Sequence, residues 1–191
     1  MYIVAGKYKN HKLRSPKGME TRPTTNRLRE ALFNICQSYI ENARFLDLFA
    51  GSGAIGLEAL SRGAKEVTFI DSHRESIHCI KQNIESLQLE TNARAIQGDV
   101  FTLIPKFEKQ GVKFDIIYAD PPYEQGHGEQ LWSQKLLQLI DQHQVLEPGG
   151  YLFIEESSSM ELTLDGLSTL EVVSIRKMGR ASLLQFKNHD A

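Results

Sequence analysis

The sequence predicts an α/β protein with a Rossmann-like, mostly parallel sheet of about seven strands and helices on both faces. Three observations lead to this class. From residue 44 onward, short apolar runs alternate with helical patterns in this chain of 191 residues. The runs look like strands buried on both faces, which is typical of parallel sheets. Two β-rich runs on either side of Gly179 indicate an antiparallel hairpin at the C-terminal end.

The N-terminal part has a different pattern. Residues 2–14 alternate apolar and basic side chains, which favours a short hairpin, and residues 15–25 hold the Pro and Gly of a loop. The next apolar residues follow helical spacing, with a threonine placed to cap the helix, and they are Leu28, Ala31, Leu32 and Ile35. We therefore divide the chain into a basic N-terminal arm at 1–25 and an α/β domain at 26–191.

The expected strands of the domain are short apolar runs, at 45–49, 67–70, 93–96, 114–118 and 151–154. Helical patterns separate them, and the clearest is the series Ile77, Ile80, Ile84 and Leu87. The two runs of the terminal hairpin lie at 170–175 and 182–186. This order of elements is typical of a doubly wound sheet.

Composition excludes several classes of protein. Apolar residues make up 41% and charged residues 24%, which argues against a disordered or fibrous chain. Cys36 and Cys79 lie 43 residues apart, so neither a disulfide framework nor a four-cysteine zinc site is expected. The six histidines have no metal-ligand spacing, and no apolar run is long enough for a membrane span. We expect a cytoplasmic protein without a bound metal.

Charge is unevenly distributed along the chain. Residues 1–30 contain eight Lys or Arg and two Asp or Glu, a net +6. The remainder holds 14 of the 22 bases and 22 of the 24 acids, a net −8. A basic arm on an acidic body is typical of nucleic-acid binding, and a solvated leader explains the same charge equally well.

A glycine-rich loop follows the first expected strand. Gly51 and Gly53 allow the backbone to approach a ligand, and Gly56 allows the next helix to pack on the strand. Free N–H groups at the start of that helix favour a polar or anionic partner. No Gly-Lys-Ser/Thr follows, which excludes a P-loop, and a tight structural turn is the alternative to ligand binding.

Three carboxylates suggest which ligand binds there. Asp71 ends the second strand, 20 residues after Gly51, where it could accept hydrogen bonds from the ribose of NAD or of S-adenosylmethionine. Asp47 at the end of the first strand would repel a pyrophosphate and attract the ammonium group of a methionine moiety. Asp99 follows the third strand and could accept from an adenine amine. This set favours S-adenosyl-L-methionine, although Asp71 and Asp99 could each be ordinary loop acids or helix caps.

The segment Asp120-Pro121-Pro122-Tyr123 ends the strand at 114–119. Two prolines remove two backbone donors, so the Asp120 carboxylate and the proline carbonyls are acceptors in a rigid turn. Acceptors beside an aromatic ring suit a planar amine such as the exocyclic NH2 of a nucleobase, on which Tyr123 could stack. A Pro-Pro turn can also be merely the end of a strand.

At this point the chain resembles class I S-adenosylmethionine-dependent methyltransferases of the amino-N type. More narrowly, it resembles the bacterial 16S rRNA guanine-N2 methyltransferases (RsmD-like). The resemblance rests on RPTTNRLREALFN at 22–34, on DLFAGSGAIGLEALSRG at 47–63 and on the Asp-Pro-Pro-Tyr turn. It implies transfer of a methyl group to N2 of a guanine in 16S rRNA, within an assembling small ribosomal subunit. It also implies a metal-free enzyme, which we expect to be a monomer.

The expected site residues form three groups. Catalytic roles are expected for Asp120, Pro121, Pro122 and Tyr123. Cofactor contacts are expected from Asp47, Phe49, Gly51, Ser52, Gly53, Gly56, Asp71, Ser72, Asp99, Val100, Thr24 and Arg27. RNA contacts are expected from Lys7, Lys9, Lys12, Arg14 and Arg22.

Other functions remain open from the residues alone. DNA adenine-N6 and protein glutamine methyltransferases use similar turns, and only the resemblance favours guanine. An NAD-dependent oxidoreductase would explain the glycine loop but would give no role to Asp47 or to the Asp-Pro-Pro-Tyr turn. A non-catalytic RNA-binding module would explain the basic arm alone.

Overall fold

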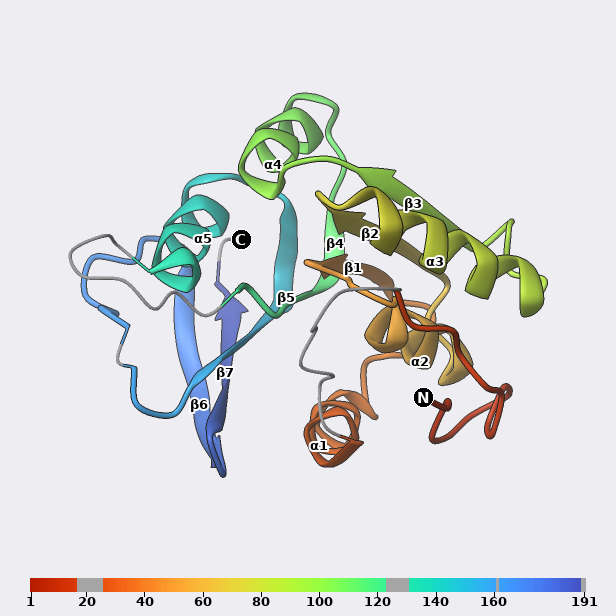
Figure 1. Ribbon diagram of the computed structural model, residues 1–191. Coiled ribbons are helices and arrows are strands. Elements are labelled where there is room, and N and C mark those ends of the chain that lie inside the picture. Colours follow the sequence, from red (N-terminus) through yellow and green to blue (C-terminus); the bar gives the residue numbers. More distant parts are fainter. Residues whose placement is uncertain (17–25, 123–130, 161, 190–191) are drawn as a thin grey trace. The chain divides into compact units, whose positions relative to one another are not determined.

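The computed structural model describes residues 1–16, 26–122, 131–160 and 162–189. The chain divides into two compact units, Met1–Val100 and Phe101–Ala191. Within the described residues there are five helices and seven strands, which are labelled in Figure 1. This alternation confirms the expected α/β class.

The first unit contains a three-stranded parallel sheet in the order β3-β2-β1. Its strands are β1 (Arg44–Leu48), β2 (Glu66–Asp71) and β3 (Ala93–Gln97). The central strand β2 is buried from its second residue to its last, because it has a neighbour on each side and helices packed against it. The carboxyl ends of β1 and β2 therefore lie at the same edge of the sheet, where parallel α/β proteins bind ligands.

Three helices belong to this unit: α1 (Asn26–Cys36), α2 (Ala54–Ser61) and α3 (Arg74–Ser86). In α1 the buried side chains include Leu28, Leu32 and Phe33, and the Phe33 ring stacks on Phe45 of β1 with ring centroids 6.4 Å apart. Every residue of α2 is buried, whereas α3 buries one face and exposes the other. The apolar spacing in the sequence thus identified the helix faces that pack on the sheet.

The N-terminal segment, Met1–Pro16, folds back on itself and packs against this unit. An antiparallel bridge pairs Tyr2 with Lys12, and the Ile3 N–H donates to the His11 carbonyl at 3.0 Å. Ile3 and Leu13 are buried, so this segment contributes to the core. At Gly6, whose φ is +83°, a Cβ would lie 1.9 Å from the Ser61 carbonyl oxygen, and only glycine fits there.

The second unit contains a four-stranded sheet in the order β4-β5-β7-β6. Strands β4 (Phe114–Ala119) and β5 (Leu146–Ser157) are parallel, whereas β7 (Ala181–Asn188) runs antiparallel to both β5 and β6 (Leu170–Met178). The expected C-terminal hairpin is therefore confirmed. Its helices are α4 (Val100–Lys109), which begins at the last residue of the first unit, and α5 (Trp132–Gln142).

Strand β5 is longer than the sequence predicted. The expected run covered residues 151–154, but the strand begins at Leu146 and includes Pro148 and Gly149. Its pairing with β4 shifts register between Phe114 and Ile116, which is the irregularity that accommodates a proline and a glycine within a strand.

Candidate active site

The glycine loop connects β1 to α2 at the carboxyl edge of the first sheet (Figure 1). Three of its residues have left-handed backbone: Phe49 at φ 58°, Gly51 at 55° and Gly53 at 76°. Gly53 is the N-cap of α2 and has no side chain to cap it, so the first N–H groups of the helix lack a side-chain acceptor from that position. Among the described residues, no atom lies within 4 Å of where a Gly51 Cβ would be, so this backbone is open to a ligand.

Asp47 is buried below this loop, with 1% of its surface exposed. Its Oδ2 accepts a hydrogen bond from the Gly56 N–H at 2.9 Å, in the first turn of α2. A carboxylate at a helix N-terminus is favoured by the helix dipole. The side chain therefore fixes the start of α2, a role that the sequence analysis did not foresee. At Gly56 itself a Cβ would lie 2.3 Å from the Phe69 ring, so glycine allows α2 to pack closely on β2.

Asp71 connects the end of β2 to the glycine loop. Its Oδ2 accepts from the Gly51 N–H at 2.9 Å, and its Oδ1 accepts from the His73 N–H at 2.8 Å. The His73 imidazole Nδ1 lies 3.2 Å from the same Oδ1. Only 6% of Asp71 is exposed. The structure thus brings the predicted glycine loop and the predicted ribose acceptor into direct contact.

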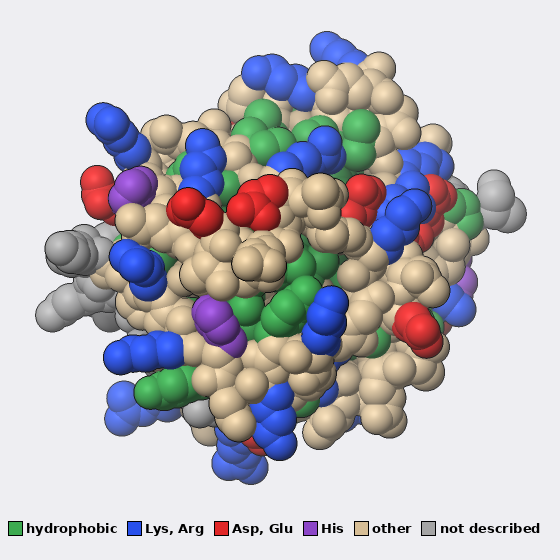
Figure 2. Space-filling model, turned by 90° about the vertical axis from the view of Figure 1, so that its right-hand side faces the viewer, with side chains coloured by type: hydrophobic (Ala, Val, Ile, Leu, Met, Phe, Trp, Pro, Cys, Tyr) green, Lys and Arg blue, Asp and Glu red, His purple; other side chains and the backbone are tan. Residues whose placement is uncertain are grey.

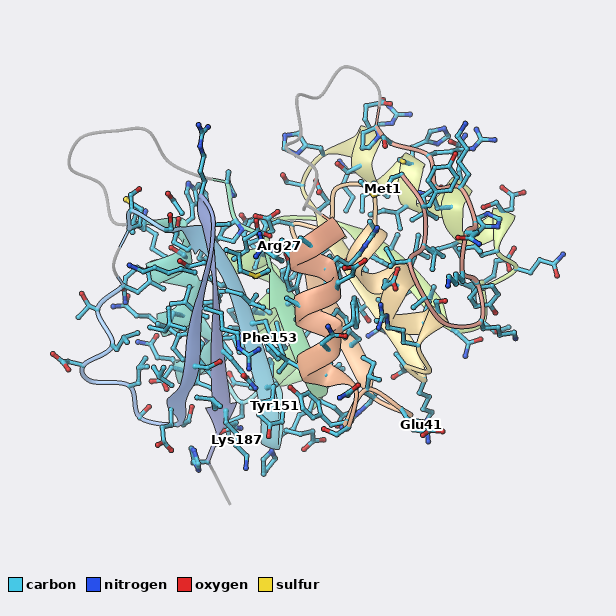
Figure 3. The ribbon with its side chains drawn as sticks, turned by 90° about the horizontal axis from the view of Figure 1, so that it is seen from below. Met1, Arg27, Glu41, Tyr151, Phe153 and Lys187 are labelled. Atoms are coloured by element: carbon cyan, nitrogen blue, oxygen red, sulfur yellow. The ribbon has the colours of Figure 1, made fainter. Side chains whose placement is uncertain are left out.

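The other predicted cofactor residues that the structure describes belong to the same unit, Met1–Val100. Ser52 is largely buried, and its carbonyl accepts from the Asn83 side chain of α3 at 3.0 Å. Ser72 and Asp99 are exposed at the carboxyl ends of β2 and β3, and Val100 is buried next to Asp99. Arg27 is exposed on the first turn of α1, as Figure 3 shows. Thr24 lies outside the described residues.

The Asp-Pro-Pro-Tyr turn belongs to the second unit, where it follows β4 directly. Asp120 is half-buried, Pro121 is buried and Pro122 is exposed. Tyr123 lies outside the described residues. The partly accessible carboxylate is suited to contact a substrate at the carboxyl edge of a parallel strand pair.

The basic side chains of the N-terminal segment point outward. Lys7, Lys9, Lys12 and Arg14 are all exposed, and Arg22 lies outside the described residues. Figure 2 shows Lys and Arg side chains spread over one face of the molecule, in its upper and lower parts, with Asp and Glu side chains between them. Arg29 differs, although the charge balance of residues 1–30 includes it. It is 1% exposed, and its Nη2 donates to the Tyr2 carbonyl at 2.8 Å.

A buried carboxylate holds the N-terminal segment in place. Glu58 of α2 is fully buried and accepts the N–H groups of Val4 and Ala5, at 2.7 and 2.9 Å. Arg62 pairs with it at 2.8 Å and Arg29 at 3.9 Å. Burial lowers the pKa of Arg29, and the Glu58 charge opposes that shift. These buried contacts hold the backbone of the segment, from which its lysine side chains extend into solvent, in one place on α2.

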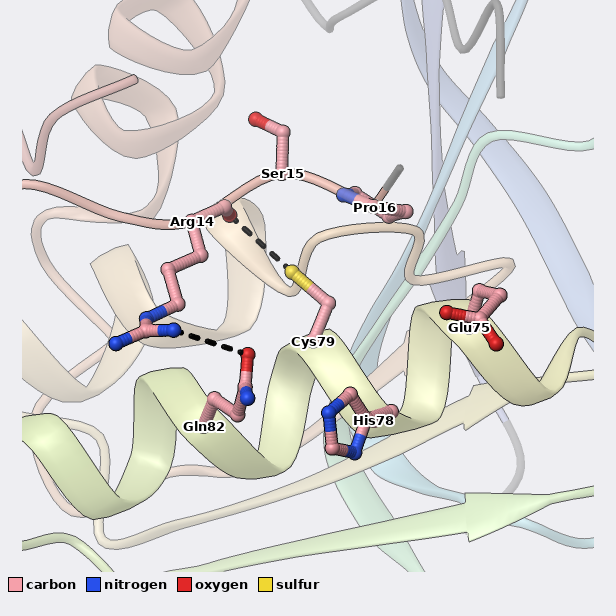
Figure 4. A pocket seen from close by; sticks show the side chains of 7 residues that line it. All are labelled: Arg14, Ser15, Pro16, Glu75, His78, Cys79 and Gln82. Atoms are coloured by element: carbon pink, nitrogen blue, oxygen red, sulfur yellow. Dashed lines mark hydrogen bonds between the residues drawn. The ribbon is translucent and has the colours of Figure 1, made fainter. Parts of the chain in front are cut away.

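A pocket of about 400 Å³ lies between this segment and α3, as Figure 4 shows. It is lined by Arg14, Ser15, Pro16, Glu75, His78, Cys79 and Gln82. The Cys79 thiol donates to the Arg14 carbonyl at 3.3 Å, and burial raises the pKa of that thiol. Cys79 is therefore a structural contact and is not activated as a nucleophile.

Neither a metal site nor a membrane-spanning helix is found in the described part of the chain. No group of three or more His, Cys, Asp or Glu side chains there could hold a metal ion. No helix in that part is long and apolar enough to cross a membrane.

Comparisons with known proteins identify relatives of this chain. The family model described as Conserved hypothetical protein 95 matches residues 1–187. The putative rRNA methyltransferase YlbH of Bacillus subtilis is 36% identical over 162 residues, or 85% of each chain. Ribosomal RNA small subunit methyltransferase D of Buchnera aphidicola is 32% identical over 162 residues, which covers 85% of this chain and 81% of the relative.

A solved structure is similar over the whole chain. The putative methyltransferase yhhF from Escherichia coli has a TM-score of 0.83 and 27% identity, with 100% of this chain and 99% of that chain covered. A 16S rRNA N2 G1207 methyltransferase (RsmC) of Thermus thermophilus, in complex with AdoMet and guanosine, has a TM-score of 0.68. At 24% identity, over 91% of this chain and 45% of that chain, it supports the fold alone.

Proposed function

The chain belongs to the family described as Conserved hypothetical protein 95, and we propose that it is an S-adenosylmethionine-dependent methyltransferase of a guanine N2 amine in 16S rRNA. The relatives named ribosomal RNA small subunit methyltransferase D support the substrate class. The observation that carries the proposal is the contact of the Asp71 carboxylate with the Gly51 N–H, at an open glycine loop that follows a buried Asp47.

The residues of the first unit suit this cofactor. The first N–H groups of α2, which Gly53 leaves without a side-chain cap, could donate to a polar ligand, and the open backbone at Gly51 leaves room for it. The Asp71 carboxylate can accept ribose hydroxyls through the lone pairs that its backbone donors leave available. The negative charge of Asp47 favours a cationic methionine moiety over a pyrophosphate. When bound, S-adenosylmethionine supplies an electrophilic methyl group on sulfur.

The Asp-Pro-Pro-Tyr turn would activate the amine. The lone pair of a guanine N2 amine is delocalised into the ring, which makes the nitrogen a poor nucleophile. The Asp120 carboxylate and the Pro121 carbonyl would accept hydrogen bonds from its two N–H groups. These bonds would localise the lone pair and offset the positive charge that grows on nitrogen. A new N–C bond would form as the S–C bond breaks, and the proton that the nitrogen loses would pass to the Asp120 carboxylate or to water. Holding the amine close to the methyl carbon contributes several kcal/mol more.

The N-terminal segment would hold the RNA. Residues 31–191 have a net charge of −8, so phosphate contacts fall to Lys7, Lys9, Lys12 and Arg14 of this segment and to Arg22 beyond it. Glu58 fixes the segment, which reduces the ordering cost of binding. The substrate would be the RNA of an assembling small ribosomal subunit in the cytoplasm, with the enzyme acting as a monomer.

Calorimetry and methyl transfer test this proposal with the purified chain. S-adenosylmethionine should bind and NAD should not, and labelled methyl should appear on small-subunit RNA as N2-methylguanosine. The competing oxidoreductase function would be favoured by tight NAD binding with no heat from S-adenosylmethionine.

A further inference from the structure

Strand β5 of the second unit carries two adjacent buried glutamates that the mechanism above does not use. Glu155 and Glu156 are each 6% exposed. A buried carboxylate is costly unless it is partnered, and an apolar residue of similar volume would often be at least as stable. Their position near the carboxyl end of β5 raises the question of what they do.

The two glutamates point to opposite faces of the sheet and have different partners. Glu156 accepts hydrogen bonds from the Ser133 hydroxyl of α5 and from the Ser157 N–H. This pair holds α5 on its face of the sheet. Glu155 accepts from the Tyr118 hydroxyl of β4 at 2.8 Å, across to the neighbouring strand. Tyr118 is itself 1% exposed.

The register places Glu155 beside the Asp-Pro-Pro-Tyr turn. Tyr118 pairs with Phe153 and Ala119 with Ile154, so the next position along both strands sets Asp120 next to Glu155. Because side chains alternate along a strand, Tyr118 and Asp120 share a face, as do Phe153 and Glu155. Figure 3 shows Tyr151 and Phe153 close together on β5, where their rings stack with centroids 6.4 Å apart. Glu155 continues that row.

We propose that Glu155 is a positioning residue for the methyl transfer, acting through the Tyr118 hydroxyl to fix the end of β4 from which Asp120 projects. The hydrogen bond joins β4 to β5 at Tyr118, near the end of β4. The two prolines that follow have no N–H group, so they cannot donate a backbone hydrogen bond to a neighbouring strand. Without it, the end of β4 keeps its backbone pairing with β5 but loses this side-chain restraint two residues before Asp120. This inference takes the reaction, methyl transfer at Asp120, from the proposed function, whereas the contact of Glu155 with Tyr118 does not depend on it.

The test compares a set of single and double variants in methyl-transfer kinetics. Tyr118→Phe and Glu155→Leu should each lower kcat by about 10- to 100-fold, with the Kd for S-adenosylmethionine unchanged, since a small misplacement of a reacting group costs that much. Glu155→Gln should recover most of kcat because its amide oxygen can still accept from Tyr118. The double variant Tyr118→Phe/Glu155→Leu should be no slower than the single ones.

Ser133→Ala is the matched control, because it removes a buried hydroxyl-to-carboxylate bond on the other face of the same strand. It should lower the unfolding temperature as much as Tyr118→Phe does and leave kcat unchanged. Wild-type kcat in Tyr118→Phe, or an equal loss in Ser133→Ala, would overturn the inference.

Hydrogen exchange gives a readout that does not require activity. Amide exchange at Ala119 and Asp120 should accelerate in Tyr118→Phe and not in Ser133→Ala. Unchanged exchange in both would also overturn the positioning role. If the wild-type chain methylated no RNA, the proposed function would fail, whereas the exchange result would still decide the role of Glu155.

Discussion

Replacing Asp71 by Ala tests the cofactor site most informatively, because this carboxylate serves both the fold and the proposed ligand. The substitution removes two backbone hydrogen bonds to an ionised acceptor, from Gly51 at 2.9 Å and from His73 at 2.8 Å. Such bonds contribute about 1.5–3 kcal/mol each. Water can reach the exposed His73, so we expect the free energy of unfolding to fall by about 3 kcal/mol, the lower end of the sum.

The effect on binding is separate from the effect on stability. Loss of the ribose hydrogen bonds should weaken S-adenosylmethionine binding by about 1–3 kcal/mol, or roughly 5- to 150-fold in Kd. Isothermal calorimetry on the folded variant measures this, and urea unfolding measures stability in parallel. Glu75→Gln is the control, because it removes a nearby exposed charge in the first turn of α3. Wild-type affinity in Asp71→Ala would refute the assignment of this edge to the cofactor.

Three further predictions concern other parts of the molecule. Asp120→Ala should lower kcat by about 100-fold or more with cofactor affinity intact, and single-turnover methyl transfer would reveal any surviving rate. Substituting Lys7, Lys9, Lys12 and Arg14 together should weaken RNA binding. The slope of log affinity against log salt concentration should fall by about one unit per lost phosphate contact, which filter binding at several salt concentrations would show. An unchanged slope would mean that these side chains do not contact RNA phosphates. Burial raises the pKa of Asp141, but the N–H donors of Ser168, Thr169 and Leu170, at the start of β6, outweigh it and hold that pKa below its usual value. The carboxylate therefore stabilises the fold above about pH 4 and loses that contribution as pH falls, so Asp141→Asn should flatten the acid limb of urea stability, and an identical limb would contradict this.

The sequence predicted the sheet and its edge well, for a physical reason. Strands buried on both faces appear as continuous apolar runs, and a strand followed by spaced glycines marks the carboxyl edge. The contact between Asp71 and Gly51 was thus within reach of pattern analysis, although its role in shaping the loop was not. Asp47 was expected to face a ligand, and its bond to the start of α2 depends on helix geometry that no local pattern states.

Long-range contacts between buried polar groups could not be predicted from the sequence. Glu58 accepts N–H groups 54 and 53 residues away, and nothing in the neighbourhood of either partner indicates the pair. Arg29 was counted with the other bases of residues 1–30, yet it is buried next to the same carboxylate. The Tyr118–Glu155 bond likewise depends on strand register, which follows from the three-dimensional pairing of β4 with β5.

The central claim is that this chain methylates a guanine amine of 16S rRNA, and nucleoside mass spectrometry tests it most directly. Ribosomal RNA from a strain lacking the gene should contain less N2-methylguanosine than RNA from its parent. Expression of the wild-type chain should restore the lost nucleoside, and expression of Asp120→Ala at the same level should not. Unchanged N2-methylguanosine in the deletion strain, or full restoration by Asp120→Ala, would contradict the account.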